Sequence, residues 1–320
     1  MQKTNFDFMG KRKIAWIISI TLVVVALGLL AVRGLNYGLD FTGGVQVELG
    51  FENPTAPELI REQLISAGFE KGVVQNFGTE RDILIRMPPQ ENVSGVAAGS
   101  GGAESDQSKL GNKIAGVLKD IYPNMKVRRS EYVGPSVGQE LREDGGLALL
   151  IALVIVMMYI MFRFSGKFAI GAVAALVHDV IIIAGIFSLF QWTFDLTIVA
   201  AGLAVIGYSL NDTIVVSDRI RENFRKIRKG SSESIINASL NQTLGRTLVT
   251  SLTTLLVLVA LRIMGGELIA GFATALIFGV LVGTYSSIYV ASNILLIMNV
   301  SKADLALPEK EDSSPELDLP

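Results

Sequence analysis

Long apolar stretches separated by short polar connections dominate the chain. A helix needs about 20 mainly apolar residues to cross a membrane. The stretches that meet this length or approach it are 14–32, 145–162, 168–190, 196–217, 247–264 and 268–298. The first follows Lys11, Arg12 and Lys13 and lacks a small-residue cleavage site, so we interpret it as an uncleaved anchor. The pattern predicts a bundle of six transmembrane helices.

Lysine and arginine are distributed unevenly among the polar connections. They occur in residues 1–13, in 163–167 and in 218–246, where a basic loop leads into the fifth stretch. The connections without Lys or Arg are 191–195 and 265–267. Because cytoplasmic connections are enriched in these residues, both termini are expected in the cytoplasm.

One long segment, residues 36–144, falls on the opposite side of the membrane. Its alternating and amphipathic patterns predict strands at 45–51, 73–77, 82–87 and 125–133, and helices at 57–67 and 110–121. This β-α-β-β-α-β order is typical of a ferredoxin-like α+β domain. Residues 92–107, rich in Gly, Ser and Ala, are expected to form a flexible loop, and the acidic residues 301–320 a disordered cytoplasmic tail.

The amino-acid composition excludes several classes of function. The 320 residues are 50% hydrophobic and only 18% charged, against about 25% charged in soluble proteins. The net charge of -2 gives no sign of a nucleic-acid partner. With no Cys and a single His, the chain offers no thiolate or multi-histidine metal site, and no cofactor is indicated. Because nucleotide-binding motifs are missing, we do not expect the chain to hydrolyse ATP itself, and the energy for any work would come from a partner or from the membrane. We do not expect an enzyme.

Asp212 lies within the fourth apolar stretch, near its cytoplasmic end. A carboxylate in a membrane helix is costly and usually faces the bundle interior or a water path. Asn211 is its neighbour in sequence, and Tyr208 precedes it by about one turn, on the same helix face. Two interpretations follow. Asp212 handles a proton or another ion, or it is a structural polar clamp between helices.

Three further ionisable residues extend this hypothesis. Arg246 begins the fifth helix on the same side and is a plausible counter-charge to Asp212, or it only marks the membrane boundary. An Asp that alternately pairs with Arg and takes up a proton would be a two-state electrostatic element. His178 and Asp179 in the third helix form either a second station of a proton relay or a hydrogen-bonded lock between helices.

The sixth helix carries small residues at every fourth position. They include Gly271, Ala275, Gly279 and Gly283. Such a stripe allows close approach of helix backbones. We expect it to pack against a neighbouring helix, either in this chain or in a partner.

Four motifs resemble the SecD/SecF family of bacterial protein-export membrane proteins. They are the Gly-Leu-Asp-Phe-Thr-Gly-Gly segment 38–44, the Gly-Pro-Ser-Val-Gly segment 134–138, the Gly-Tyr-Ser-Leu-Asn-Asp-Thr segment 207–213 and the Asn-Gln-Thr-Leu-Gly-Arg-Thr segment 241–247. The resemblance covers nearly the whole chain. One departure is Gly245, where the family more often has Ser.

The resemblance implies an RND-like fold in the bacterial inner membrane, with residues 36–144 periplasmic. It implies pairing with SecD, association with the SecYEG channel and sometimes YajC and YidC, and use of the proton motive force to help an unfolded polypeptide through late translocation. Asp212 matches the family's membrane carboxylate and Arg246 its basic neighbour. Asp40, Gly43 and Gly44 belong to a structural motif, whose glycines supply a tight turn.

Other functions make different demands on the sequence. A self-sufficient RND-type exporter of small molecules would carry about twelve helices, so six suggest half of a pair. An intramembrane aspartyl protease would need two catalytic carboxylates in Gly-x-Gly-Asp-like signatures, and Asp212 instead follows Ser-Leu-Asn. A subunit that serves only as a non-conducting scaffold of the translocase remains the main alternative.

Overall fold

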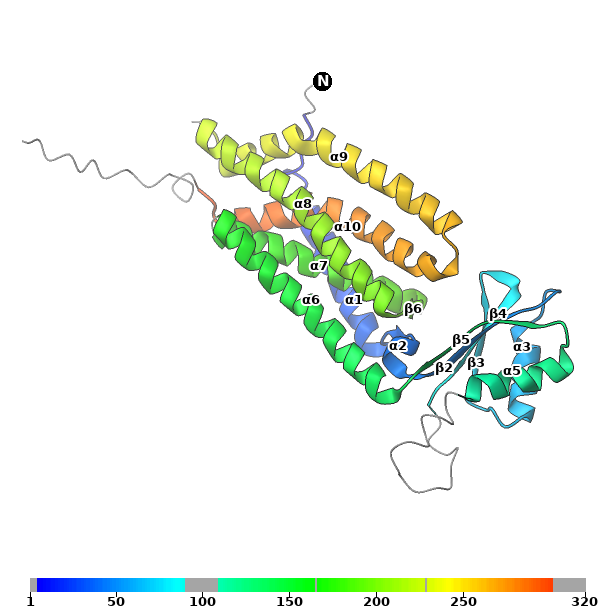
Figure 1. The fold of residues 1–320 in the computed structure, drawn as a ribbon. Helices are drawn as coiled ribbons and strands as arrows, with labels where there is room; N and C mark the ends of the chain where they lie inside the picture. The colour runs from blue at the N-terminus through cyan, green and yellow to red at the C-terminus, as the bar shows by residue number, and fades with distance from the viewer. Residues whose placement is uncertain (1–4, 90–108, 165, 228, 302–320) are drawn as a thin grey trace, which may run out of the picture.

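The computed structural model describes residues 5–89, 109–164, 166–227 and 229–301. These residues form a helical bundle with an α/β domain at one end (Figure 1). The expected loop 92–107 and most of the expected tail 301–320 lie outside the described residues.

Within the described residues, six helices are long and apolar enough to cross a membrane, as the sequence predicts. They are α1 (Arg12–Val32), α6 (Pro135–Arg163), α7 (Gly166–Phe190), α8 (Leu196–Lys226), α9 (Ser232–Met264) and α10 (Glu267–Ile297). Helices α7, α8 and α10 bury more of their apolar windows than α1, α6 and α9. The latter three expose most of the large hydrophobic side chains, which suits contact with lipid or with a partner's helices.

Several helices extend beyond the predicted spans. Helix α6 begins at Pro135, ten residues before the expected start at Gly145. Helix α8 continues to Lys226, and α9 starts at Ser232, so most of the segment 218–246 is helical. The Ser231 side chain caps α9 by accepting a hydrogen bond from Ser234 N, and helix-favouring charged residues continue α8 into water.

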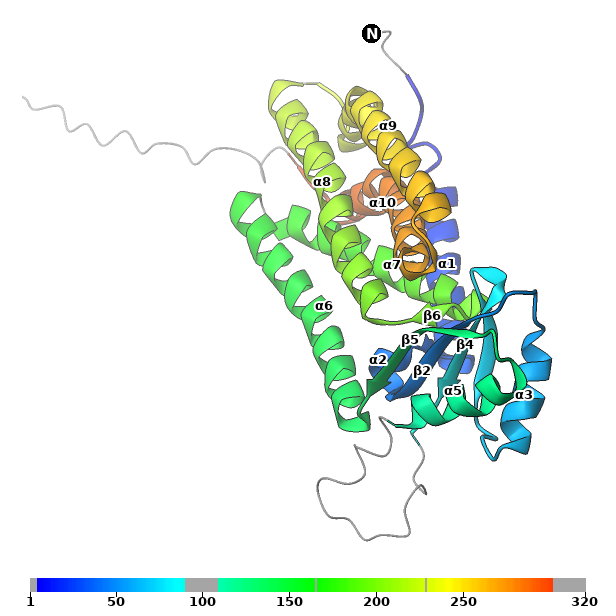
Figure 2. The ribbon, with the colours of Figure 1, turned by 45° about the vertical axis from the view of Figure 1, so that its right-hand side comes forward.

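The α/β domain follows the expected order of elements. It comprises β2 (Gly44–Gly50), α3 (Pro57–Ser66), β3 (Val73–Phe77), β4 (Thr79–Met87), α5 (Leu110–Ile121) and β5 (Lys126–Val133). The four strands form an antiparallel sheet in the order β3-β4-β2-β5. An apolar core that includes Val47, Ile85 and Ile114 joins one sheet face to α3 and α5. The other face is directed toward the bundle (Figure 2).

A short segment connects α1 to this sheet. It contains β1 (Asn36–Tyr37) and α2 (Leu39–Thr42), and β1 pairs in parallel with β6 (Thr193–Phe194) in the α7–α8 connection. Gly43 and Gly44 then turn the chain into β2 with φ angles of 67° and 114°. A Cβ on Gly44 would collide with the Met87 carbonyl oxygen, so glycine is required here for conformation and for space.

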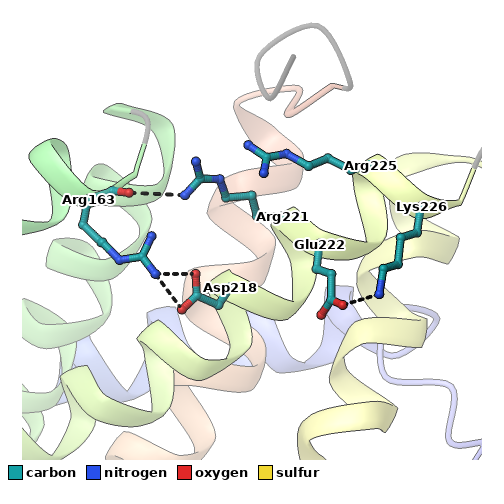
Figure 3. A pocket seen from close by; sticks show the side chains of 6 residues that line it. All are labelled: Arg163, Asp218, Arg221, Glu222, Arg225 and Lys226. Atoms are coloured by element: carbon teal, nitrogen blue, oxygen red, sulfur yellow. Dashed lines mark hydrogen bonds and ion pairs between the residues drawn. The ribbon is translucent and has the colours of Figure 1, made fainter. Parts of the chain in front are cut away.

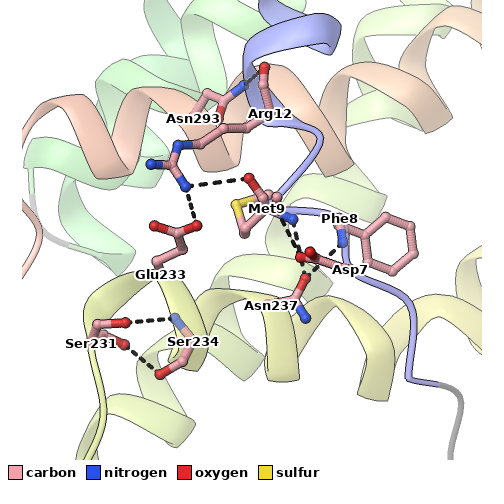
Figure 4. Close-up of polar contacts among 10 residues, drawn as sticks. Asp7, Phe8, Met9, Arg12, Ser231, Glu233, Ser234, Asn237 and Asn293 are labelled. Atoms are coloured by element: carbon pink, nitrogen blue, oxygen red, sulfur yellow. Dashed lines mark hydrogen bonds and ion pairs between the residues drawn. The ribbon is translucent and has the colours of Figure 1, made fainter.

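The N-terminal segment is bound to the opposite end of the bundle. Asn237 of α9 accepts hydrogen bonds from the backbone nitrogens of Phe8 and Met9 at 2.8 and 3.2 Å, and Arg12 forms an ion pair with Glu233 (Figure 4). Met9 is buried in the apolar core at this end. Hydrogen bonds from Phe6, Phe8 and Met9 to α9 therefore hold the segment before α1 against the bundle.

Candidate functional site: buried polar groups between the membrane helices

A fully buried carboxylate, Asp179 of α7, lies at the centre of the bundle. One oxygen accepts hydrogen bonds from Ser209 Oγ of α8 at 2.7 Å and Ser286 Oγ of α10 at 2.8 Å. The other lies 3.0 Å from His178 Nδ1. Because both oxygens have partners, the cluster joins three helices by hydrogen bonds. His178 and Asp179 thus share one network, while Nε2 of His178 is buried without a partner among the described residues.

Asp212, one turn beyond Ser209 on α8, has a different environment. It is 3% exposed, and its Oδ2 is buried without a hydrogen-bond partner in the described part of the chain. Two buried hydroxyls, Thr213 Oγ1 and Thr247 Oγ1, also have no partner there. Buried polar atoms are nearly always paired in proteins, so an orphaned carboxylate oxygen indicates strain, function or an ion that is not present.

The structure does not join Arg246 to Asp212 by a hydrogen bond or a salt bridge. Arg246 lies on α9 with an exposed side chain. The pairing of Arg246 with Asp212 that the sequence suggests therefore stays a prediction.

Tyr208 and Asn211 point to different surroundings. The Tyr208 hydroxyl donates to Ser251 Oγ of α9 at 3.2 Å, and Ser251 shares a 2.7 Å hydrogen bond with Thr284 of α10. Asn211 is exposed on the bundle surface. Neighbouring residues of a helix are about 100° apart around its axis, so burial of Asp212 turns Asn211 outward. The structure does not bring Asn211 into the buried polar site.

The small-residue stripe of α10 lies against α8 of the same chain. A Cβ on Gly279 would collide with Val205, and one on Gly283 would come within 3.0 Å of Ser209 Cβ and 3.5 Å of Asp179 Oδ2. Gly271 faces Ile198, and Ala275 is fully buried. Of the two neighbours that the sequence allows for this stripe, the structure shows the internal one. The stripe brings α10 close enough for Ser286 to reach Asp179.

At the far end of α8, Asp40 of the Gly-Gly motif holds the helix start. Its Oδ2 accepts a 3.0 Å hydrogen bond from Leu196 N, the first residue of α8. Gly38 N donates to Phe194 O at 2.8 Å. A carboxylate at a helix N-terminus is favoured by the helix dipole and by unpaired backbone N–H groups. The motif thus fastens the segment after α1 to the α7–α8 connection.

A charged pocket of about 440 Å³ lies at the other end of α8 (Figure 3). Arg163, at the end of α6, donates a hydrogen bond from Nη2 to Asp218 Oδ1 at 3.3 Å. Arg221 donates a hydrogen bond from Nη1 to the Arg163 carbonyl oxygen. Both guanidinium groups lie over the Phe164 ring. Arg163 and Arg221 are among the basic residues whose distribution predicts the cytoplasmic side. In the structure they connect the exposed ends of α6 and α8.

In the described residues, six helices long and apolar enough to cross a membrane, buried carboxylates between them and an attached α/β domain are the features of a multi-pass membrane protein. Two family descriptions match the sequence: "Protein export membrane protein SecD/SecF, C-terminal" over residues 113–301 and "SecD/SecF GG Motif" over residues 28–55. The chain belongs to the SecF group of this SecD/SecF family of protein-export membrane proteins, so the resemblance seen in the four motifs is confirmed.

Relatives cover nearly the whole chain. The protein translocase subunit SecF of Vibrio alginolyticus is 50% identical over 315 residues, which is 98% of this chain and 96% of the relative. The subunit SecF of Pseudomonas aeruginosa is 48% identical over 311 residues, covering 97% and 96%.

A solved structure is also similar. The crystal structure of SecDF, a translocon-associated membrane protein from a Thermus species, matches with a TM-score of 0.81 and 36% identity over 92% of this chain. The match spans 39% of the SecDF chain. SecDF in a super-membrane-facing form matches with a TM-score of 0.65 at 37% identity, also over 92% of this chain and 39% of that one.

Proposed function

We propose that this chain is the SecD-partner subunit of an accessory complex of the bacterial Sec translocase, and that it uses the proton motive force to promote late protein translocation. Its relatives are named as translocase subunits, and the similar solved chain is a SecDF protein described as translocon-associated. The chain matches 39% of SecDF, which leaves room for a SecD-like part supplied by another subunit. SecYEG, YajC and YidC are the further partners that the family resemblance implies.

The proposed topology places both termini in the cytoplasm and residues 36–144 in the periplasm. It rests on the basic residues at one end of the bundle and on the position of the α/β domain at the other (Figure 1). We assign this domain to the ferredoxin-like class because its element order is β-α-β-β-α-β and its antiparallel strand order is β3-β4-β2-β5. Such a domain would meet the unfolded polypeptide as it leaves the channel.

One observation carries the proton-coupling proposal: Asp212 is buried in a membrane helix and has an oxygen without a hydrogen-bond partner among the described residues. A carboxyl group already occupied by three donors, as at Asp179, would have to break a network to exchange a proton. Asp212 would not have to break a hydrogen-bond network in the described residues to exchange a proton. Movement of Arg246 toward Asp212 would favour the carboxylate, and its withdrawal would favour proton uptake, so the pair forms the two-state element.

Asp212→Asn tests this assignment because it keeps the side-chain size and removes the exchangeable charge. We expect normal insertion and SecD binding, with loss of gradient-dependent export of a preprotein into membrane vesicles. Asp218→Asn is the matched control, since Asp218 lies on the same helix with a side chain 44% exposed. Wild-type export by Asp212→Asn at equal complex abundance would reject proton coupling and favour the non-conducting scaffold.

A further inference from the structure

Arg86 of β4 extends from the α/β domain to the membrane bundle. It lies on the sheet face that α3 and α5 leave uncovered, and its Nη2 donates a 2.8 Å hydrogen bond to Thr193 Oγ1. Thr193 belongs to β6, in the connection between α7 and α8. Figures 1 and 2 both show the sheet directed at this end of the bundle. The hydrogen bond therefore links the two parts of the molecule.

Two carboxylates act on the Arg86 guanidinium at this contact. Burial lowers the pKa of Arg86, and the nearby charges of Asp195 and Asp40 raise it, so the carboxylates offset part of the cost of desolvating the cation. Its Nε is buried without a partner among the described residues. The Arg86 guanidinium is thus held by the charges of two carboxylates and by its hydrogen bond to Thr193, while its Nε donor stays unused among the described residues.

Both carboxylates are fixed to the first turn of α8. Asp195 is the N-cap and accepts from Ile198 N at 3.2 Å and from the Thr197 hydroxyl. Asp40 accepts from Leu196 N. When α8 moves, these carboxylates must move with it or lose their hydrogen bonds. Arg86 therefore faces an anionic surface that follows the position of α8.

The surroundings of this contact are incompletely filled and carry many polar side chains. A cavity of about 400 Å³ separates the sheet from the bundle, lined by side chains that include Gln46, Gln75, Arg129 and Arg262. Packed apolar cores join the helices to one another and the sheet to α3 and α5, whereas this boundary contains a cavity with a mixed polar and apolar lining. A contact made of charge beside such a space can separate and re-form without exposing a hydrophobic core.

We propose that Arg86 is the positioning residue that docks the α/β domain on the first turn of α8 and passes movement of this helix to the domain. Asp212 lies 17 residues beyond Asp195 on the same helix, a distance of about 25 Å at 1.5 Å per residue. The coupling part of this proposal rests on the proposed proton function of Asp212. The docking part stands on the hydrogen bond between Arg86 and Thr193 and on the cavity whose lining brings Arg86 together with Asp40 and Asp195.

The absence of Cys allows a direct measurement of docking on the full chain. Spin labels on Lys119→Cys of α5 and Met264→Cys of α9 occupy exposed positions in the domain and at the same end of the bundle. In the purified complex with SecD, double electron–electron resonance reports the distance between them. With Arg86 present we expect one dominant distance. Arg86→Gln should reduce that population at least by half, and Arg86→Lys should give an intermediate value.

Arg81→Gln is the matched control, because Arg81 is an exposed arginine of the same strand. Thermal unfolding of each variant checks that the α/β domain remains folded. An unchanged distance distribution in Arg86→Gln would overturn the docking role.

The coupling role is tested by combining substitutions. Asp212→Asn should shift the distance distribution when Arg86 is present and leave it unshifted in the Arg86→Gln background. The same shift in both backgrounds, or none when Arg86 is present, would overturn transmission through Arg86. Docking itself is measured without proton flux. If Asp212→Asn retains export while Arg86→Gln still undocks the domain, the proposed proton function fails and the docking role stands.

Discussion

Two buried aspartates of the bundle, Asp179 and Asp212, differ in what their oxygens contact. Asp179 has partners for both oxygens and connects α7, α8 and α10, whereas Asp212 lies one turn from one of those partners with an oxygen left unpaired. Burying either charged carboxylate in the membrane interior costs free energy. The comparison indicates that burial alone does not identify a functional carboxylate. A complete hydrogen-bond set is typical of a structural lock, whereas an incomplete one is what the proposed proton role of Asp212 requires.

The largest effect on stability should come from removing the satisfied carboxylate. Asp179→Leu leaves the Ser209 hydroxyl and one His178 nitrogen without their acceptor, and it removes the shorter of the two hydrogen bonds that Ser286 donates. Breaking a buried network from one side costs about 3 kcal/mol or more. Unfolding in mixed detergent micelles should show this loss. A variant as stable as the wild type would mean that the network does not hold the helices together.

Gly283→Leu should break the same network without changing its polar groups. The new side chain would meet Ser209 and Asp179 and push α10 away from α8. Overpacking of this kind costs about 2 kcal/mol. Gly28→Leu on α1 is the control, because nothing lies within 4 Å of a Cβ there. Equal unfolding midpoints for the two variants would show that α8 and α10 do not need this close approach.

Ser286→Ala removes one donor and leaves Asp179 with its others. We expect a loss of about 1 kcal/mol, in line with hydrogen bonds between membrane helices. A double-mutant cycle with Ser209→Ala should show coupling, since both hydroxyls donate to the same oxygen. Strict additivity would contradict a shared network.

Asp212→Asn should have the smallest effect on stability. Its Oδ2 has no hydrogen bond to lose in the described part of the chain, so we expect a change of about 0.5 kcal/mol or less in the free energy of unfolding, alongside the proposed loss of export. The same micelle unfolding assay used for Asp179 provides the comparison. A loss as large as that of Asp179→Leu would assign Asp212 to the structural clamp that the sequence also allows.

The sequence by itself determined the six spans, the order of elements in the α/β domain and the family. These follow from local patterns, because a run of apolar residues must leave water and an alternating run must present one face to a core. Gly43 and Gly44 also belong to this group, since a turn at positive φ selects glycine directly. Helix ends were less predictable. Helices α6, α8 and α9 continue beyond the apolar stretch, where hydrophobicity gives no signal.

Only the tertiary structure decided which polar residues meet. Each residue turns a helix by about 100°, so Ser209 reaches Asp179 on another helix while Asn211, next to Asp212, faces outward. Helix rotation is set by packing along the α8–α10 stripe, which no single helix encodes. For the same reason Arg86 resembles any other strand arginine in the sequence. Its contact with the start of α8 arises because the folded chain brings residues 40, 86 and 195 to one place.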